Sequence, residues 1–260
     1  MKRRRLLAGA PLLATGIVAG GAGAAPPLHV GAALPDPPFE LMTADGAAGF
    51  DIDLMRRIAE RLGRPWRLVR YTGADFNGIF AGLGRGDYDC IASGTTLTPQ
   101  RAAVVDFCAP YVVSGQSLVV DRRRHPQVHG VDDLKGLVIG VQRGNTSEPV
   151  AEKLVAEGRA GRVRLYAYDA IARALDDLST GSCDAFMKLA PVTQWFVRDR
   201  AQLAVVQTGI TREELGICVR QGDAGLRTAI NDAQAALTAD GTLPALIKKW
   251  LGTGASAVGP

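Results

Sequence analysis

The sequence predicts an α/β fold, and three observations support this prediction. Short apolar runs typical of buried strands alternate along the chain with segments whose apolar residues recur at helical spacing. Two of these runs lead through a polar loop into a helix start, at 91–101 and 139–149. The length, 260 residues, fits one large domain or two modest ones. We therefore expect α/β lobes with mainly parallel sheets and a ligand site at the carboxyl ends of their strands.

The first half of the chain alternates strands and helices. A helix is predicted at 50–62, because apolar residues recur on one face from Phe50 to Leu62 and Gly63 ends the pattern. A shorter helix at 76–83 is closed by Gly84. The apolar runs between these helices predict strands at 28–33, 66–71 and 90–92.

The second half repeats this alternation. Near its end, Leu226, Ile230 and Leu237 mark the buried face of an amphipathic helix, and another helix follows at 243–251. Further helices are predicted at 149–157, 170–178 and 191–197, with a helical turn at 131–134. Strands are predicted at 117–120, 137–141, 163–166, 185–187, 204–207 and 215–219.

The loop at 93–101 carries the most specific local signal. It combines small hydroxyl residues with Thr98, which suits an N-cap, and Pro99, which suits the first helical position. Arg101 then falls in the first helical turn, where the helix dipole disfavours a cation. Such an arginine beside free backbone N–H groups can clamp a carboxylate or phosphate. The local pattern is equally compatible with an exposed arginine tolerated at small cost.

The N-terminus has the pattern of a signal peptide. Residues 1–5 are positively charged, 6–18 form a short apolar run, and Ala22-Gly23-Ala24 suits a cleavage site. Residues 1–24 also hold all of the excess charge, because the remaining chain has 26 basic and 26 acidic residues. The basic pI is therefore no argument for binding nucleic acid. We expect an exported, periplasmic protein; the choice between the Sec and Tat routes stays open.

The four cysteines, Cys90, Cys108, Cys183 and Cys218, lie in apolar runs. Export permits a disulfide, and buried free thiols are the alternative. Their spacing, with only three histidines in the chain, does not predict a metal site. We expect neither a metal nor a cofactor.

The order of the motifs resembles the polar amino-acid family of extracytoplasmic solute-binding proteins of ABC importers. Each motif is weak alone, but together they span the chain that follows the signal peptide. They are Pro-Phe-Glu at 38–40, Gly-Phe-Asp-Ile-Asp-Leu at 49–54, Gly-Asp-Tyr-Asp at 86–89, the loop at 93–101, 105–111, Asp-Leu-Lys-Gly at 133–136, 140–146, Cys-Asp-Ala-Phe at 183–186, and Ala-Asp-Gly-Thr-Leu at 239–243 before Trp250.

This resemblance implies a two-lobed fold of the type II periplasmic-binding class, with a hinge of two crossover strands and ligand in the interlobe cleft. Lobe 1 would comprise 27–113 plus 217–254, and lobe 2 would comprise 118–213. It also implies that the lobes close around a small carboxylate-bearing solute and that the closed form docks on the permease as a monomer. The implied ligand-binding residues are Arg101, Thr96, Gly94, Ser93, Thr146 and, stacking on the ligand side chain, Phe50.

Two positions depart from the family pattern. The acid that usually accepts the ligand's α-ammonium is replaced by Leu189, preceded by Lys188. Asp36 stands where the family often carries an aromatic residue. Because an unpaired buried ammonium is costly, either Asp36 supplies the acid from the opposite lobe or the ligand has no α-ammonium. In the second case Lys188 would meet a second carboxylate.

The leading interpretation is a binding protein without catalysis that delivers an amino acid or related carboxylate to an ABC permease. An exported enzyme on the same fold, similar to the cyclohexadienyl dehydratases, is the alternative, with Asp36 as the candidate general acid. A periplasmic sensor or adaptor subunit is a third class. No nucleophile triad is evident around the few histidines.

Overall fold

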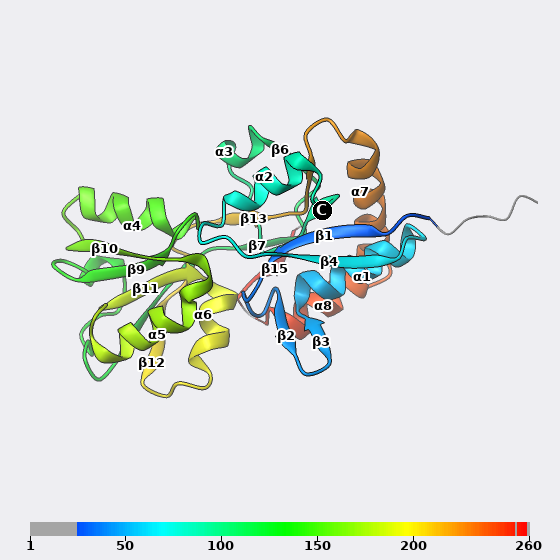
Figure 1. Ribbon diagram of the computed structural model, residues 1–260. Coiled ribbons are helices and arrows are strands. Elements are labelled where there is room, and N and C mark those ends of the chain that lie inside the picture. Colours follow the sequence, from blue (N-terminus) through cyan, green and yellow to red (C-terminus); the bar gives the residue numbers. More distant parts are fainter. Residues whose placement is uncertain (1–24, 253, 259–260) are drawn as a thin grey trace, which may run out of the picture.

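The computed structural model describes residues 25–252 and 254–258, as two α/β lobes joined by a narrow set of strands (Figure 1). The predicted signal peptide at 1–24 lies outside the described residues. Within the described part, no helix combines the length and apolar character needed to cross a membrane. That part also holds no group of three or more His, Cys, Asp or Glu residues suited to a metal ion.

Lobe 1 is built on a five-stranded sheet with the order β4-β1-β5-β14-β6. Strand β14 runs antiparallel to both of its neighbours, whereas β1 is parallel to β4 and β5. The strands are β1 (Leu28–Ala33), β4 (Trp66–Tyr71), β5 (Cys90–Ile91), β6 (Val105–Phe107) and β14 (Cys218–Arg220). A small hairpin of β2 (Leu41–Thr43) and β3 (Gly46–Ala48) lies beside this sheet.

Helices cover both faces of the lobe 1 sheet. Helix α1 buries an apolar face because Phe50, Leu54 and Ile58 recur at helical spacing and are fully buried. It packs with α7 and α8, which come from the far end of the chain (Figure 1). The helices are α1 (Phe50–Arg61), α2 (Gly78–Arg85), α3 (Pro99–Ala102), α7 (Ala224–Ala239) and α8 (Thr242–Trp250).

Lobe 2 repeats this plan on a second five-stranded sheet with the order β10-β9-β11-β8-β12. Here β8 is the antiparallel strand, paired with β11 and β12. The strands are β8 (Gln116–Asp121), β9 (Val138–Gln142), β10 (Arg162–Tyr166), β11 (Ala185–Leu189) and β12 (Leu203–Gln207). The helices are α4 (Ser147–Ala156), α5 (Ile171–Thr180) and α6 (Ala190–Val197), with 3₁₀ turns η1 (Val131–Asp133) and η2 (Tyr168–Ala170).

The hinge is a three-stranded antiparallel sheet with β7 (Val112–Ser114) between β13 (Glu213–Leu215) and β15 (Ser256–Ala257). The predicted hinge of two crossover strands is therefore extended by a third strand near the end of the chain. The Ser114 hydroxyl donates to the Gly254 carbonyl at 2.8 Å, which fixes the approach to β15. Beside β7, a Cβ at Gly115 would lie 2.0 Å from the Thr211 carbonyl oxygen, so only glycine fits there.

The predicted alternation of strands and helices is confirmed, with two corrections. The mainly parallel sheets are also confirmed, because only one of the five strands in each large sheet runs against the others. The strand predicted at 215–219 is two strands, since the chain leaves the hinge sheet after Leu215 and enters the lobe 1 sheet at Cys218. The helix predicted from Phe76 begins at Gly78, which leaves Phe76 in the preceding loop. The residue boundaries predicted for the two lobes stay a prediction.

All four cysteines are buried free thiols, so the disulfide alternative is not realised in this structure. Burial raises the pKa of each thiol, most strongly at Cys218 and Cys90. A thiol with a raised pKa is a poor nucleophile, and these residues serve as small core side chains.

Candidate functional site

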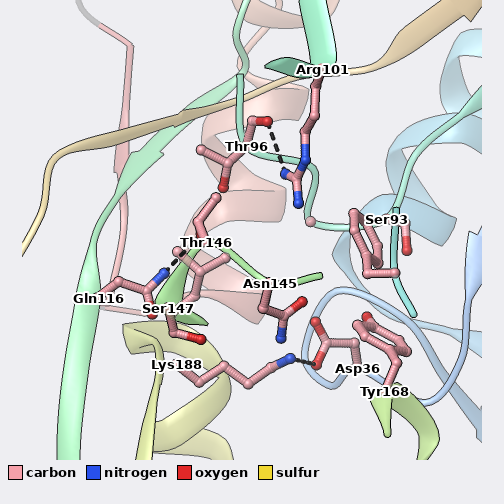
Figure 2. A pocket seen from close by; sticks show the side chains of 13 residues that line it. Asp36, Ser93, Thr96, Arg101, Gln116, Asn145, Thr146, Ser147, Tyr168 and Lys188 are labelled. Carbon is pink, nitrogen blue, oxygen red and sulfur yellow. Dashed lines mark hydrogen bonds and ion pairs between the residues drawn. The ribbon is translucent and has the colours of Figure 1, made fainter. Parts of the chain in front are cut away.

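A small cavity of about 20 Å³ lies between the lobes and is the candidate functional site (Figure 2). Side chains reach it from both sheets and from the loops at the carboxyl ends of β1, β4, β5, β9 and β11. It is lined by Asp36, Phe76, Ser93, Gly94, Thr96, Arg101, Gln116, Asn145, Thr146, Ser147, Tyr168, Lys188 and Leu189. Its volume is that of about one water molecule, so a ligand the size of an amino acid requires the lobes to separate.

Arg101 is placed by the local structure that the sequence predicted. The Thr98 hydroxyl caps the short helix α3 by accepting from the Arg101 N–H at 3.2 Å, and Pro99 occupies the first turn. Arg101 is only 7% exposed, so the alternative of a tolerated exposed arginine is wrong. Burial lowers the pKa of its guanidinium, which nevertheless stays charged at neutral pH.

The guanidinium of Arg101 contacts both lobes. It donates to the Thr96 carbonyl in lobe 1 and to the Gly144 carbonyl in lobe 2, each at 3.0 Å, and to the Asn77 amide oxygen at 3.4 Å. Its central carbon lies 5.0 Å from the Phe76 ring centroid. Among the described residues, three of the five N–H groups of the guanidinium thus have partners, and two are left for an anion.

Ser93 and Gly94 line the cavity but are held from behind by two buried acids. The Ser93 hydroxyl donates to Glu40 at 2.5 Å, and the Gly94 N–H donates to Asp51 at 2.6 Å. Gly94 has a φ of +52°, a conformation that favours glycine. Burial raises the pKa of Glu40 well above its usual value and that of Asp51 to about 7. Both acids therefore hold a proton more readily than exposed carboxyls do.

Thr96 and Thr146 face one another across the lobes, and an acid that the sequence analysis missed holds both. The hydroxyls of Thr96 and Thr146 each donate to Glu213 Oε2 at 2.7 Å. Glu213 Oε1 accepts from Gln116 at 2.8 Å and from Thr211 at 2.7 Å. Because Glu213 belongs to the hinge strand β13, this cluster joins the hinge to the cavity-lining loops of both lobes.

Lys188 and Asp36 form an ion pair across the cleft (Figure 2). Lys188 Nζ lies 2.9 Å from Asp36 Oδ1, and both side chains are at most 5% exposed. Lys188 also donates to the Gln142 side-chain oxygen at 2.7 Å and lies 5.1 Å from the centre of the Tyr168 ring. Burial raises the pKa of Asp36, and the charge of Lys188 counteracts part of that rise.

The start of helix α4 forms another wall of the cavity. Its N-cap is Thr146 and its first residue is Ser147, and both line the cavity. Among the next two residues, Glu148 donates its N–H to the Asn145 carbonyl at 3.0 Å and Pro149 has no N–H, so of residues 147–149 only Ser147 keeps a free N–H. The Ser147 hydroxyl is fully buried and has no hydrogen-bond partner among the described residues. A buried donor without a partner at a helix N-terminus is suited to an anionic group.

The structure does not bring Phe50 into this cavity, which corrects the expectation that it stacks on a ligand. Phe50 is fully buried in the lobe 1 core, with its ring centroid 5.4 Å from that of Tyr111. The aromatic walls are instead Phe76 and Tyr168, whose ring centroids lie 5.1 Å apart. No signal in the sequence separates Phe76 from Phe50, because each stands at the start of a predicted helix.

The remaining predicted site residues come together at the cavity: Asp36, Ser93, Gly94, Thr96, Arg101, Thr146 and Lys188. The family resemblance also implies that the backbone amides at 144–146 take part, but the side chains of Gln116, Asn145 and Ser147 were not predicted. The lobes also meet through the Tyr168 N–H, which donates to the Ala74 carbonyl at 2.8 Å. Two α/β lobes on a strand hinge, closed over a charged cavity, define a hinged ligand-binding protein of the periplasmic-binding class.

Comparisons with known proteins give the family. The sequence profile of the bacterial extracellular solute-binding proteins, family 3, matches residues 28–253, and the chain belongs to this family. The L-cystine-binding protein TcyJ of Escherichia coli (strain K12) is 31% identical over 219 residues, which cover 83% of this chain and 79% of that protein. The two-lobed prediction and the family resemblance are both confirmed.

Two solved structures extend the comparison. An ancestral arginine-binding protein bound to arginine superposes with a TM-score of 0.79 and 33% identity, covering 86% of this chain and 98% of that one. The ancestral amino acid-binding protein AncCDT-1, a precursor of cyclohexadienyl dehydratase, gives a TM-score of 0.77 and 30% identity, covering 86% and 95%. These relatives are binding proteins, one of which precedes an enzyme.

Proposed function

We propose that this protein is the solute-binding component of an ABC importer and binds an amino acid or a related small carboxylate between its lobes. One observation carries the proposal. The buried guanidinium of Arg101 lines the interlobe cavity, contacts both lobes and keeps two N–H groups for an anion. A carboxylate bound there would hold the lobes together, which is the switch that a hinged binding protein requires.

The other end of an amino acid requires an acceptor for its ammonium. The backbone position that the family uses carries Leu189, which lines the cavity and offers no charge. Asp36 is the acidic side chain of the cavity lining, and it approaches from lobe 1. We assign the ammonium to Asp36 and the α-carboxylate to Arg101, with the first turn of α4 supporting the carboxylate.

The protein is exported to the periplasm, acts as a monomer and delivers its ligand to a permease, in line with relatives named as an ABC transporter arginine-binding protein and a probable amino-acid ABC transporter-binding protein. The proposal includes no catalytic step. As a general acid, Asp36 would need a free proton path to the substrate, and in the closed structure it is paired with Lys188. Incubation with prephenate or arogenate should leave either compound unchanged in the absorbance spectrum and by chromatography. Turnover would replace this proposal with the dehydratase alternative.

The decisive experiment is calorimetric titration of the ligand-stripped protein with a panel of amino acids and keto acids, followed by Arg101→Ala. We expect the variant to lose about a hundredfold or more in affinity, because it removes a charge-assisted clamp. Arg85→Ala is the matched control, since Arg85 is exposed and paired only with Asp87 on the surface. Arg101→Lys keeps the charge without the fork and should fall between the two. Unchanged affinity in a folded Arg101→Ala would refute the clamp.

A further inference from the structure

The ion pair between Lys188 and Asp36 joins the two lobes inside the proposed ligand site. Asp36 follows β1 of lobe 1, and Lys188 lies on β11 of lobe 2. Opening the hinge therefore separates the two charges. A ligand that enters the opened cleft lies between them and must offer each a new partner, because an unpaired charge left buried on closure costs several kcal/mol.

The charges of the cavity wall describe the ligand that could do this. Three lining side chains are charged: Arg101 and Lys188 are cations, and Asp36 is an anion. Figure 2 shows Arg101 pointing in from one end and the Lys188–Asp36 pair lying at the other. Glu213 is not part of the cavity lining, because its two carboxylate oxygens already accept four hydrogen bonds, from Thr96, Gln116, Thr146 and Thr211. The wall therefore carries one net positive charge.

A second set of anion donors surrounds Lys188. The ammonium has three N–H groups, and the contacts with Gln142 and Asp36 occupy two of them. The Ser147 hydroxyl, buried and without a partner among the described residues, lies on the same side of the cavity, as does the Asn145 side chain (Figure 2). This part of the wall can receive an anionic group that is distinct from the one bound by Arg101.

We infer that the preferred ligand is an acidic amino acid, whose two carboxylates and one ammonium match the three charged side chains of the cavity wall. This inference rests on the proposed function. The α-carboxylate binds Arg101, the ammonium replaces Lys188 as the partner of Asp36, and the side-chain carboxylate replaces Asp36 as the partner of Lys188. The net charge of the ligand, −1, then neutralises the wall.

Cationic amino acids are rejected by the same geometry. Arginine or lysine would bring a second positive group beside Lys188, and the wall offers it no further acid. In this respect the chain would differ from the ancestral relative whose structure contains bound arginine. A neutral amino acid would pair its ammonium with Asp36 and leave the buried Lys188 without an anionic partner, beside the Gln142 side-chain oxygen and the Tyr168 ring.

The test is calorimetric titration of the wild-type chain with glutamate, aspartate, glutamine, 2-oxoglutarate and arginine. We expect glutamate or aspartate to bind at least about tenfold more tightly than glutamine, and arginine to show no measurable binding. Binding of glutamine or arginine as tight as that of glutamate would overturn the inference while the proposed function stands. If neither these compounds nor any other carboxylate binds, both the inference and the proposed function are overturned.

Two variants change the charge of the wall in opposite directions. Lys188→Met removes one cation, so glutamate should lose about a hundredfold and the preference should move to glutamine. Asp36→Asn removes the anion, so the preference should move from glutamate to 2-oxoglutarate, which has two carboxylates and no ammonium. The double variant removes the pair together and should fold even where a single variant does not. A glutamate preference that survives in the double variant would overturn the inference.

Discussion

Glu213 allows the contribution of the buried hinge cluster to stability to be measured. Glu213→Ala removes the acceptor of the three hydroxyls of Thr96, Thr146 and Thr211, whereas Gln116 keeps a partner in Thr146 at 3.0 Å. A buried donor without an acceptor costs about 1–3 kcal/mol, and hydroxyls can rotate to find a weaker partner. The lower end of that range for each hydroxyl gives a loss of about 3 kcal/mol in the free energy of unfolding.

Urea unfolding followed by circular dichroism measures this loss. Glu213→Gln should cost less than half as much. Its amide oxygen can still accept from Gln116 and Thr211, and its NH₂ group can donate to the hydroxyl oxygens of Thr96 and Thr146. The control is Glu214→Ala, next in sequence but partly exposed and paired with Arg212, which should change stability by less than about 0.5 kcal/mol. A Glu213→Ala variant within about 1 kcal/mol of wild type, or equal to Glu214→Ala, would refute the reasoning.

Three further predictions concern parts of the molecule outside the ligand cavity. Because burial raises the pKa of Asp51 from 3.8 to about 7, the folded protein retains a proton that the unfolded chain has released; the stability that Asp51 contributes is fully present below about pH 4 and is lost as the pH rises through 7. Asp51→Asn should therefore remove of the order of 4 kcal/mol from the difference in unfolding free energy between pH 4 and pH 8, and equal differences would contradict this. In helix α2, Gly84→Ala meets no atom within 4 Å and should stabilise by up to about 1 kcal/mol, whereas at Gly82 a Cβ would lie 2.3 Å from the Tyr88 hydroxyl and should lower the melting temperature. The four buried thiols should be inert to a thiol reagent in the native protein and all react after unfolding; a smaller number after unfolding would indicate a disulfide.

The sequence predicted site residues best where a residue type was unusual for its local structural context. Arg101 could be selected because a cation at a helix start conflicts with the dipole, and that conflict exists only within a few neighbouring residues. Asp36 and Lys188 could be selected as departures from a family pattern. Their pairing could not be predicted, because it depends on how far the two lobes approach one another.

Glu213 and Phe76 show what the sequence could not give. Glu213 lies 117 residues from Thr96 and 67 from Thr146, and in sequence it is one of two acids on a short strand. Phe50 and Phe76 both stand at the start of a helical pattern. Only the packing shows that the first enters the lobe 1 core and the second turns into the cleft.

The position of β14 in the lobe 1 sheet also constrains the order in which the chain can fold. Strand β14 lies between β5 and β6, although the whole of lobe 2 separates it from them in sequence. Lobe 2 is continuous from β8 to β12 and has all of its strands once Gln207 has been made. Lobe 1 has a gap in the middle of its sheet until Cys218–Arg220 arrives, and it lacks α7 and α8 until later still. During synthesis, which starts at the N-terminus, lobe 2 can thus fold first. Lobe 1 can complete its sheet and helices only after β14, α7 and α8 have been made.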